Sequence, residues 1–286
     1  MSERRSGRVP RGMLRVLGGA AALATLPAIL SMQPAMAAPC YGDCQPGVVR
    51  SAGVLKYDAP VGVDDQITIS AGDGFLTVAD PAATLTVGPG CTLVTPHEAR
   101  CAPAPAGFMA IRGLDGNDVI TNTTALAARL MGDNGDDRLV GGSGDDTLNG
   151  GFGSDVLQGG GGSDTATYSG ISNRLSVRAD LDGATGDDGS SEDGPAGARD
   201  TIAADVENLE GTNTDDVLIG NAGPNVINGS GGHDQIQGLG GNDQLTGRGG
   251  GTVDGGADTD HCTSNLVGLP AQADTFIGCE TTEIVT

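Results

Sequence analysis

The stretch that decides the fold runs from Gly132 to Thr167, where four consecutive nine-residue units read GDNGDDRLV, GGSGDDTLN, GGFGSDVLQ and GGGGSDTAT. A second run begins at Gly211 and ends at Thr246, and its units read GTNTDDVLI, GNAGPNVIN, GSGGHDQIQ and GLGGNDQLT. Self-similarity at a fixed short period is the sequence signature of a repeat architecture, in which neighbouring units stack to make a continuous core.

The units share the template G-G-x-G-x-D-x-U-x, in which U is apolar. Degenerate copies extend the two runs, since Gly113 opens GLDGNDVIT and Gly255 opens GGADTDHC. The sixth place holds Asp118, Asp137, Asp146, Asp155, Asp164, Asp216, Asn225, Asp234, Asp243 and Asp260. The eighth place holds Ile120, Leu139, Leu148, Leu157, Ala166, Leu218, Ile227, Ile236, Leu245 and Cys262.

This template predicts an all-β protein of one particular kind. Glycine at the first, second and fourth places permits positive φ and close backbone approach, so the first six residues form a turn. The last three form a very short strand whose middle side chain points inward. Two units then make one coil, and units two apart stack on the same edge. We therefore expect a parallel β-roll, which is a β-solenoid of nonapeptide repeats.

Stacking brings sixth-place carboxylates together in pairs, because Asp137 lies 18 residues before Asp155 and Asp216 lies 18 residues before Asp234. Two such carboxylates repel each other and raise each other's pKa unless a cation lies between them. Ca²⁺ suits this arrangement, because it takes 6–8 oxygen ligands, including backbone carbonyls, in flexible geometry. Mg²⁺ demands stricter octahedral geometry and keeps its waters, so it fits a backbone-rich turn less well.

The units resemble the RTX (hemolysin-type) calcium-binding nonapeptide repeats, and the overall layout is similar to secreted calcium-binding proteins of actinobacterial type. The resemblance implies Ca²⁺ held between stacked turns by aspartate side chains and loop carbonyls, with the ten sixth-place residues named above as the metal ligands. It implies a weaker site at Asn225, where an amide replaces the carboxylate. The fifth-place acids Asp136, Asp145 and Asp215 are expected to be solvated.

The first 37 residues have the pattern of a secretory signal peptide. Five arginines precede an uncharged run from Val16 to Leu30, and Ala35-Met36-Ala37 forms a small-x-small cleavage pattern before Ala38. A transmembrane anchor is the weaker alternative, because the run is short and contains proline. We therefore expect a secreted, extracellular protein without membrane insertion after cleavage.

Six cysteines follow this segment, and in a secreted chain an even number indicates disulfides. They form three local couples: Cys40 with Cys44, Cys91 with Cys101, and Cys262 with Cys279. Local pairing is favoured among the 15 connectivities that six cysteines allow, and these stay open on sequence alone. Zinc binding is a weak alternative, because no CxxC motif occurs.

The sequence divides into six regions. Residues 1–37 are the signal peptide, 38–112 a β-rich N-terminal cap, 113–167 the first repeat block, 168–210 an insert, 211–261 the second block and 262–286 a C-terminal cap. In the N-terminal cap, alternating patterns at 66–70, 75–78 and 84–87 predict strands.

Within the insert, alternation from Leu175 to Leu181 predicts a further strand. Residues 182–198 are acidic and glycine-rich, which favours a solvated loop over an ion site. The spacing of Ile202, Val206 and Leu209 fits one face of a helical turn.

Charge and the absence of catalytic motifs exclude some classes of function. Acidic residues outnumber basic ones 37 to 15, for a net charge of −22, so the chain lacks the clustered cations that nucleic acids require. No HExxH or G-x-S-x-G motif occurs, and no enzyme is expected. The sequence predicts a secreted, non-catalytic calcium-binding protein whose binding is coupled to folding. Two alternatives stay open, a calcium-stabilised surface or matrix adhesin with an extracellular polymer as partner, and an accessory module of an extracellular enzyme.

Overall fold

The computed structural model describes residues 46–51, 53–103, 107–170, 175–195, 197–266 and 272–286. The signal peptide expected over residues 1–37 and the Cys40–Cys44 couple lie outside them. No α-helix or 3₁₀-helix occurs in these ranges, and so none there is long and apolar enough to cross a membrane.

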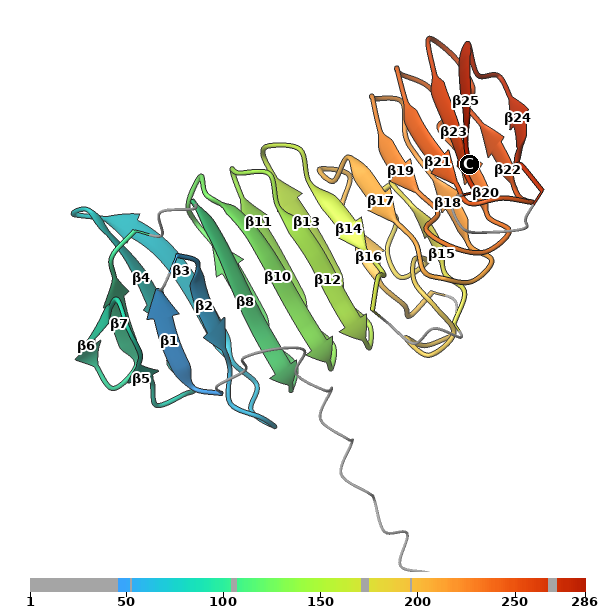
Figure 1. Ribbon diagram of the computed structural model, residues 1–286. Coiled ribbons are helices and arrows are strands. Elements are labelled where there is room, and N and C mark those ends of the chain that lie inside the picture. Colours follow the sequence, from blue (N-terminus) through green and yellow to red (C-terminus); the bar gives the residue numbers. More distant parts are fainter. Residues whose placement is uncertain (1–45, 52, 104–106, 171–174, 196, 267–271) are drawn as a thin grey trace, which may run out of the picture. The chain divides into compact units, whose positions relative to one another are not determined.

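The described residues form short strands in three sheets (Figure 1). The largest sheet contains, in spatial order, β25 (Thr281–Val285), β23 (His261–Asn265), β21 (Gln244–Gly247), β19 (Val226–Asn228), β17 (Asn208–Glu210), β14 (Thr165–Thr167), β12 (Thr147–Phe152), β10 (Ala127–Asn134), β8 (Phe108–Asp115), β2 (Leu55–Asp58), β1 (Val48–Ser51) and β5 (Thr86–Val87). We call it the long sheet.

The second sheet contains β16 (Thr201–Ile202), β13 (Val156–Gly160), β11 (Arg138–Gly142), β9 (Val119–Asn122), β3 (Gln66–Gly72), β4 (Phe75–Ala79), β7 (Glu98–Cys101) and β6 (Cys91–Thr95). The third contains β15 (Arg178–Asp180), β18 (Val217–Ile219), β20 (Gln235–Gln237), β22 (Thr252–Asp254) and β24 (Thr275–Ile277). We call these the N-terminal short sheet and the C-terminal short sheet.

Strands of the repeat blocks pair in parallel at a separation of one coil. Leu130 is in register with Leu148 in the long sheet, and Leu139 with Leu157 in the N-terminal short sheet. Consecutive nine-residue units thus alternate between two sheets, and units two apart stack. The chain is the parallel β-solenoid that the repeat predicts.

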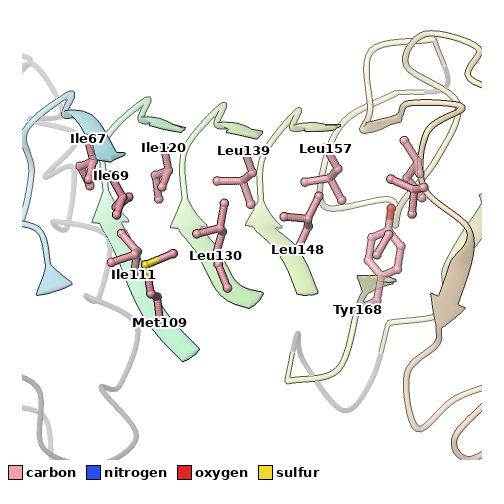
Figure 2. Close-up of a cluster of buried hydrophobic side chains, with 14 of the residues drawn as sticks. Ile67, Ile69, Met109, Ile111, Ile120, Leu130, Leu139, Leu148, Leu157 and Tyr168 are labelled. Atoms are coloured by element: carbon pink, nitrogen blue, oxygen red, sulfur yellow. The ribbon is translucent and has the colours of Figure 1, made fainter. Parts of the chain in front are cut away.

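Within the nonapeptide units the core is a column of single side chains, one from the strand of each unit. Figure 2 shows Ile120, Leu139 and Leu157 from one sheet facing Leu130 and Leu148 from the other. Every eighth-place residue is at most 1% exposed, including Ala166 and Cys262. So thin a core needs no large aromatic side chains, which accounts for a fold built almost without them.

Both ends depart from the repeat, as expected for a solenoid. At the N-terminal end, antiparallel pairs join β3 to β4, β4 to β7 and β6 to β7. The Cys91–Cys101 disulfide links β6 to β7, and Cys262–Cys279 closes the C-terminal end. The predicted β-rich N-terminal cap and two of the three predicted cysteine couples are therefore confirmed.

The helical turn predicted near Ile202 is wrong. Ile202 lies in β16 and Leu209 in β17, and Val206 lies in the connection between them. Ile202 pairs with Leu157 and Leu209 with Ala166, so both take the place of an eighth-place residue in the next coil. Their spacing fits a helical face, but it fits a strand, turn and strand equally well.

The prediction of a solvated loop over 182–198 is also wrong at two acidic residues. Asp188 is 1% exposed and accepts hydrogen bonds from the backbone N–H groups of Asp180 and Ile202. Asp193 is buried as well, and its Oδ2 accepts from the backbone N–H of Ser190. Because these carboxylates bind backbone donors, the segment is built into the fold.

Candidate metal centre

The sixth-place aspartates lie in the turns, each directly before a strand of the solenoid. All nine are buried, with exposed fractions between 0% and 2%. An ionised carboxylate at such a depth is costly unless it is paired, hydrogen-bonded or bound to a metal. The partners of its two oxygens therefore decide what each aspartate does.

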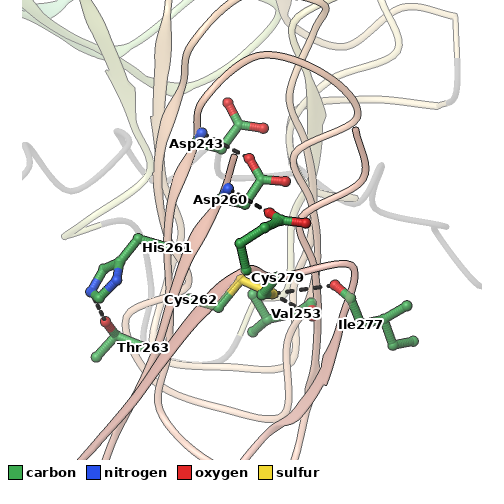
Figure 3. Close-up of a disulfide and its surroundings, with 9 residues drawn as sticks. Asp243, Val253, Asp260, His261, Cys262, Thr263, Ile277 and Cys279 are labelled. Atoms are coloured by element: carbon green, nitrogen blue, oxygen red, sulfur yellow. Dashed lines mark hydrogen bonds between the residues drawn. A yellow bond between two sulfur atoms is a disulfide. The ribbon is translucent and has the colours of Figure 1, made fainter. Parts of the chain in front are cut away.

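One oxygen of each carboxylate joins adjacent coils. The backbone N–H of Asp137 donates to Oδ1 of Asp155 at 2.8 Å, and that of Asp146 donates to Oδ1 of Asp164 at 2.8 Å. The same bond joins Asp118 to Asp137, Asp216 to Asp234, Asn225 to Asp243 and Asp243 to Asp260. Figure 3 shows the last of these beside the C-terminal disulfide. The stacking predicted from the 18-residue spacing is confirmed, and we call these rows of carboxylates the aspartate ladders.

The other oxygen has no donor. Oδ2 is buried and without a hydrogen-bond partner in Asp118, Asp137, Asp146, Asp155, Asp164, Asp234, Asp243 and Asp260. A buried, charged acceptor left unsatisfied costs several kcal/mol or takes up a proton. The same atom type repeats this feature in eight residues, and a bound cation would satisfy it.

These free oxygens face the first-place glycines. A Cβ on Gly255 would lie 2.5 Å from Oδ2 of Asp260 and 2.7 Å from the carbonyl oxygen of Gly278. At Gly141 a Cβ would meet Oδ2 of Asp146 and the carbonyl oxygen of Gly159 in the same way. A carboxylate oxygen and a carbonyl oxygen from the next coil thus converge on both of these glycines. The donor set is all oxygen and partly backbone, which fits Ca²⁺.

In the absence of a metal, burial raises the pKa of several ladder carboxylates. It raises the pKa of Asp155 to about 9, with the charges of Asp200 and Asp137 adding to the rise. Burial likewise raises the pKa of Asp137 to about 8 and that of Asp146 to about 7, although in each a backbone hydrogen bond opposes it. At neutral pH Asp137 and Asp155 therefore favour the protonated form unless a positive ion offsets their charge.

Two sixth-place residues differ from the rest. Both polar atoms of the Asn225 side-chain amide have protein partners. Nδ2 donates to the carbonyl oxygen of Glu207, and Oδ1 accepts from the N–H of Asn221. Asp216 accepts from the N–H and the hydroxyl of Thr212, which replaces the second-place glycine. Neither residue has a side-chain oxygen as free as those of the other eight.

Four acidic residues extend the ladders and were not predicted. The N–H of Asp155 donates to Asp200, that of Asp164 to Glu207 and that of Asp260 to Glu280. At the N-terminal end, the N–H of Asp65 donates to Asp118, and both oxygens of Asp65 are buried without partners. For two of the four, the sequence contains a recognisable pattern. D-T-I at 200–202 and D-Q-I at 65–67 keep the acid two residues before an apolar residue, as in the nonapeptide units.

The fifth-place acids point outward, as predicted. Asp136, Asp145 and Asp215 are exposed. In each, Oδ1 accepts the backbone N–H of the residue 18 positions later, so these side chains also tie neighbouring coils together. They do so at the surface, away from the oxygens that converge on the glycines.

Comparison with known families agrees with this geometry. A family model of the RTX calcium-binding nonapeptide repeat, four copies long, matches residues 131–166 and 210–245. No curated protein matches the chain. The matched residues include Asp137, Asp155 and Asp234, whereas Asp118 and Asp260 have the same hydrogen bonds outside them. The chain therefore contains two blocks of RTX calcium-binding nonapeptide repeats, folded as a parallel β-solenoid.

Proposed function

We propose that the protein is a secreted, non-catalytic calcium-binding β-roll in which calcium binding is coupled to folding. The observation that carries the proposal is the row of buried Oδ2 atoms without a donor. The aspartate ladders would supply these oxygens, with carbonyl oxygens of the first-place glycines completing each site. Asn225 and Asp216 would contribute least, because protein donors already occupy their oxygens.

Coupling to folding follows from where the ligands come from. Each site takes a carboxylate from one coil and a carbonyl from the next, so its ligands meet only when the two coils have stacked. Bound calcium supplies positive charge that offsets the mutual repulsion of the ladder carboxylates. An ion that binds only the folded state stabilises it by RT ln(1 + [L]/Kd).

Two observations support secretion of the protein. The arginine-rich, uncharged and small-x-small pattern of residues 1–37 is that of a signal peptide. The Cys91–Cys101 and Cys262–Cys279 disulfides suit an oxidising compartment. Extracellular calcium modules commonly bind with Kd of about 10⁻⁴–10⁻³ M, so such a chain would stay unliganded inside the cell and become ordered outside it.

Calcium-dependent circular dichroism of the full chain tests the proposal. Calcium added to the metal-free chain should increase the β signal in a saturable way, and magnesium should do so far less. A chain whose spectrum is the same with and without calcium would not have ligand binding coupled to folding, and the proposal would then be wrong.

A further inference from the structure

The insert joins the two short sheets at one point. β16 is the last strand of the N-terminal short sheet and β15 is the first strand of the C-terminal short sheet. Between them, isolated bridges pair Arg178 with Gly189 and Asp188 with Asp200. The carboxylate of Asp188 accepts the N–H of Asp180 at 2.7 Å and that of Ile202 at 2.9 Å, so one side chain ties both sheet edges together.

Three further carboxylates gather beside this junction. Asp180, Asp182 and Asp187 each offer one carboxylate oxygen, and these three oxygens lie within 4.8 Å of one another. None of the three belongs to an aspartate ladder, and all lie outside the residues that match the repeat family. Asp180 is buried, Asp187 half-buried and Asp182 exposed, so the group opens to solvent on one side.

Asp180 and Asp187 each have an oxygen without a donor, whereas Oδ1 of Asp182 accepts the backbone N–H of Ala184 at 2.6 Å. The side chain of Asp180 is only 8% exposed, and its Oδ2 contacts the guanidinium of Arg178 at 3.2 Å. Its Oδ1 is buried without a hydrogen-bond partner, and so is Oδ1 of Asp187. Arg178 balances one of the three negative charges and leaves two, which equals the charge of a divalent cation.

We infer that Asp180, Asp182 and Asp187 form a calcium site at the junction, separate from the aspartate ladders. The three ligand atoms are all carboxylate oxygens, which favours a hard cation over zinc or copper. Ca²⁺ fits better than Mg²⁺, because a one-sided group of three carboxylates leaves several positions for water in flexible geometry. This inference does not depend on calcium binding by the ladders.

The site would clamp the two short sheets to each other. Asp180 ends β15, and Asp187 precedes Asp188, whose carboxylate binds both sheet edges. In a solenoid each coil contacts only its neighbours, so a weak junction uncouples the two halves. A cation held by residues 180, 182 and 187 fixes Asp188 in the position from which it binds β15 and β16.

Equilibrium dialysis of the full chain with calcium, compared among single variants, tests the site. Asp182→Asn and Asp187→Asn should each remove one bound calcium per chain. Asp73→Asn is the matched control, because Asp73 is an exposed aspartate in the β3–β4 turn, where its φ of 52° suits asparagine. The control should bind as many calcium ions as the parent chain.

Amide hydrogen exchange gives a second, local measurement. In saturating calcium, exchange at the N–H groups of Asp180 and Ile202 should be slower in the parent and in Asp73→Asn than in Asp182→Asn. Unchanged stoichiometry together with unchanged protection in Asp182→Asn would overturn the inference. A parent that binds a single calcium, lost in Asp182→Asn, would support this site and contradict the proposed role of the ladders.

Discussion

The backbone N–H of Asp155 donates to Oδ1 of Asp200 at 2.9 Å, although 45 residues separate them in the sequence. In the first repeat block the same bond joins Asp137 to Asp155 over 18 residues. The insert therefore leaves the solenoid and returns in register, and Glu207 takes the next place in the other ladder. The ladders thus extend into a region in which the nonapeptide pattern is lost.

A first prediction concerns the register of the ladders. Asp146→Ala, Asp155→Ala and Asp200→Ala should each raise the calcium concentration needed for folding by about tenfold or more, because each removes a buried charged ligand. Asp136→Ala should change it little, since that side chain is exposed. Circular dichroism during calcium titration measures the midpoints. Equal effects in all four variants would contradict the assignment of sixth-place residues.

A second prediction concerns the first-place glycines. Gly141→Ala should destabilise the calcium-loaded fold by about 1–3 kcal/mol, because the new Cβ meets Oδ2 of Asp146 and the carbonyl oxygen of Gly159. Gly161→Ala is the control, since a Cβ there has no atom within 4 Å. Chemical denaturation in saturating calcium compares the two variants. The steric account fails if Gly161→Ala costs as much as Gly141→Ala.

A third prediction concerns pH in the absence of calcium. Burial raises the folded-state pKa of Asp137 to about 8 and that of Asp155 to about 9, above the ordinary value of 3.8. The folded chain then binds more protons than the unfolded chain, so the free energy of unfolding falls as pH rises. This contribution is complete below about pH 4 and is lost by about pH 9.

Thermal unfolding in a calcium chelator at several pH values measures this trend. The metal-free chain should melt at a higher temperature at pH 5 than at pH 8. Saturating calcium should reverse the order, because only the ionised carboxylates bind the ion. A metal-free chain more stable at pH 8 than at pH 5 would show that its ladders are not protonated in the folded state.

A fourth prediction concerns the core column. Leu148→Ala should cost about 2–5 kcal/mol, because Leu148 is fully buried between the side chains of adjacent coils. Val226 is 47% exposed on β19 of the same sheet, and Val226→Ala should stay within about 0.5 kcal/mol of the parent. Both values come from denaturant unfolding in calcium. Similar costs at the two positions would contradict the inward assignment of the eighth place.

The sequence was sufficient wherever the period was unbroken. The eighth-place residues had to face inward and the sixth-place residues had to stack, because nine residues fix one turn and one strand. The register of Leu139 with Leu157 and the bond from Asp146 to Asp164 follow from that period alone.

The sequence was not sufficient where the length of the repeat unit changes. Glu207 substitutes for aspartate and follows Asp200 at seven residues instead of nine, so it was not recognised as part of a ladder. The burial of Asp188 depends on backbone donors at 180 and 202, which only the folded chain brings together. Spacing alone also does not separate a helical face from two short strands, as at Ile202 and Leu209.

Calorimetric titration of the full, metal-free chain with calcium, repeated with magnesium, tests the central claim most directly. Binding to the free Oδ2 atoms of the aspartate ladders predicts saturable heat with several calcium ions per chain, and far less heat with magnesium. The absence of heat with calcium up to tens of millimolar would contradict it.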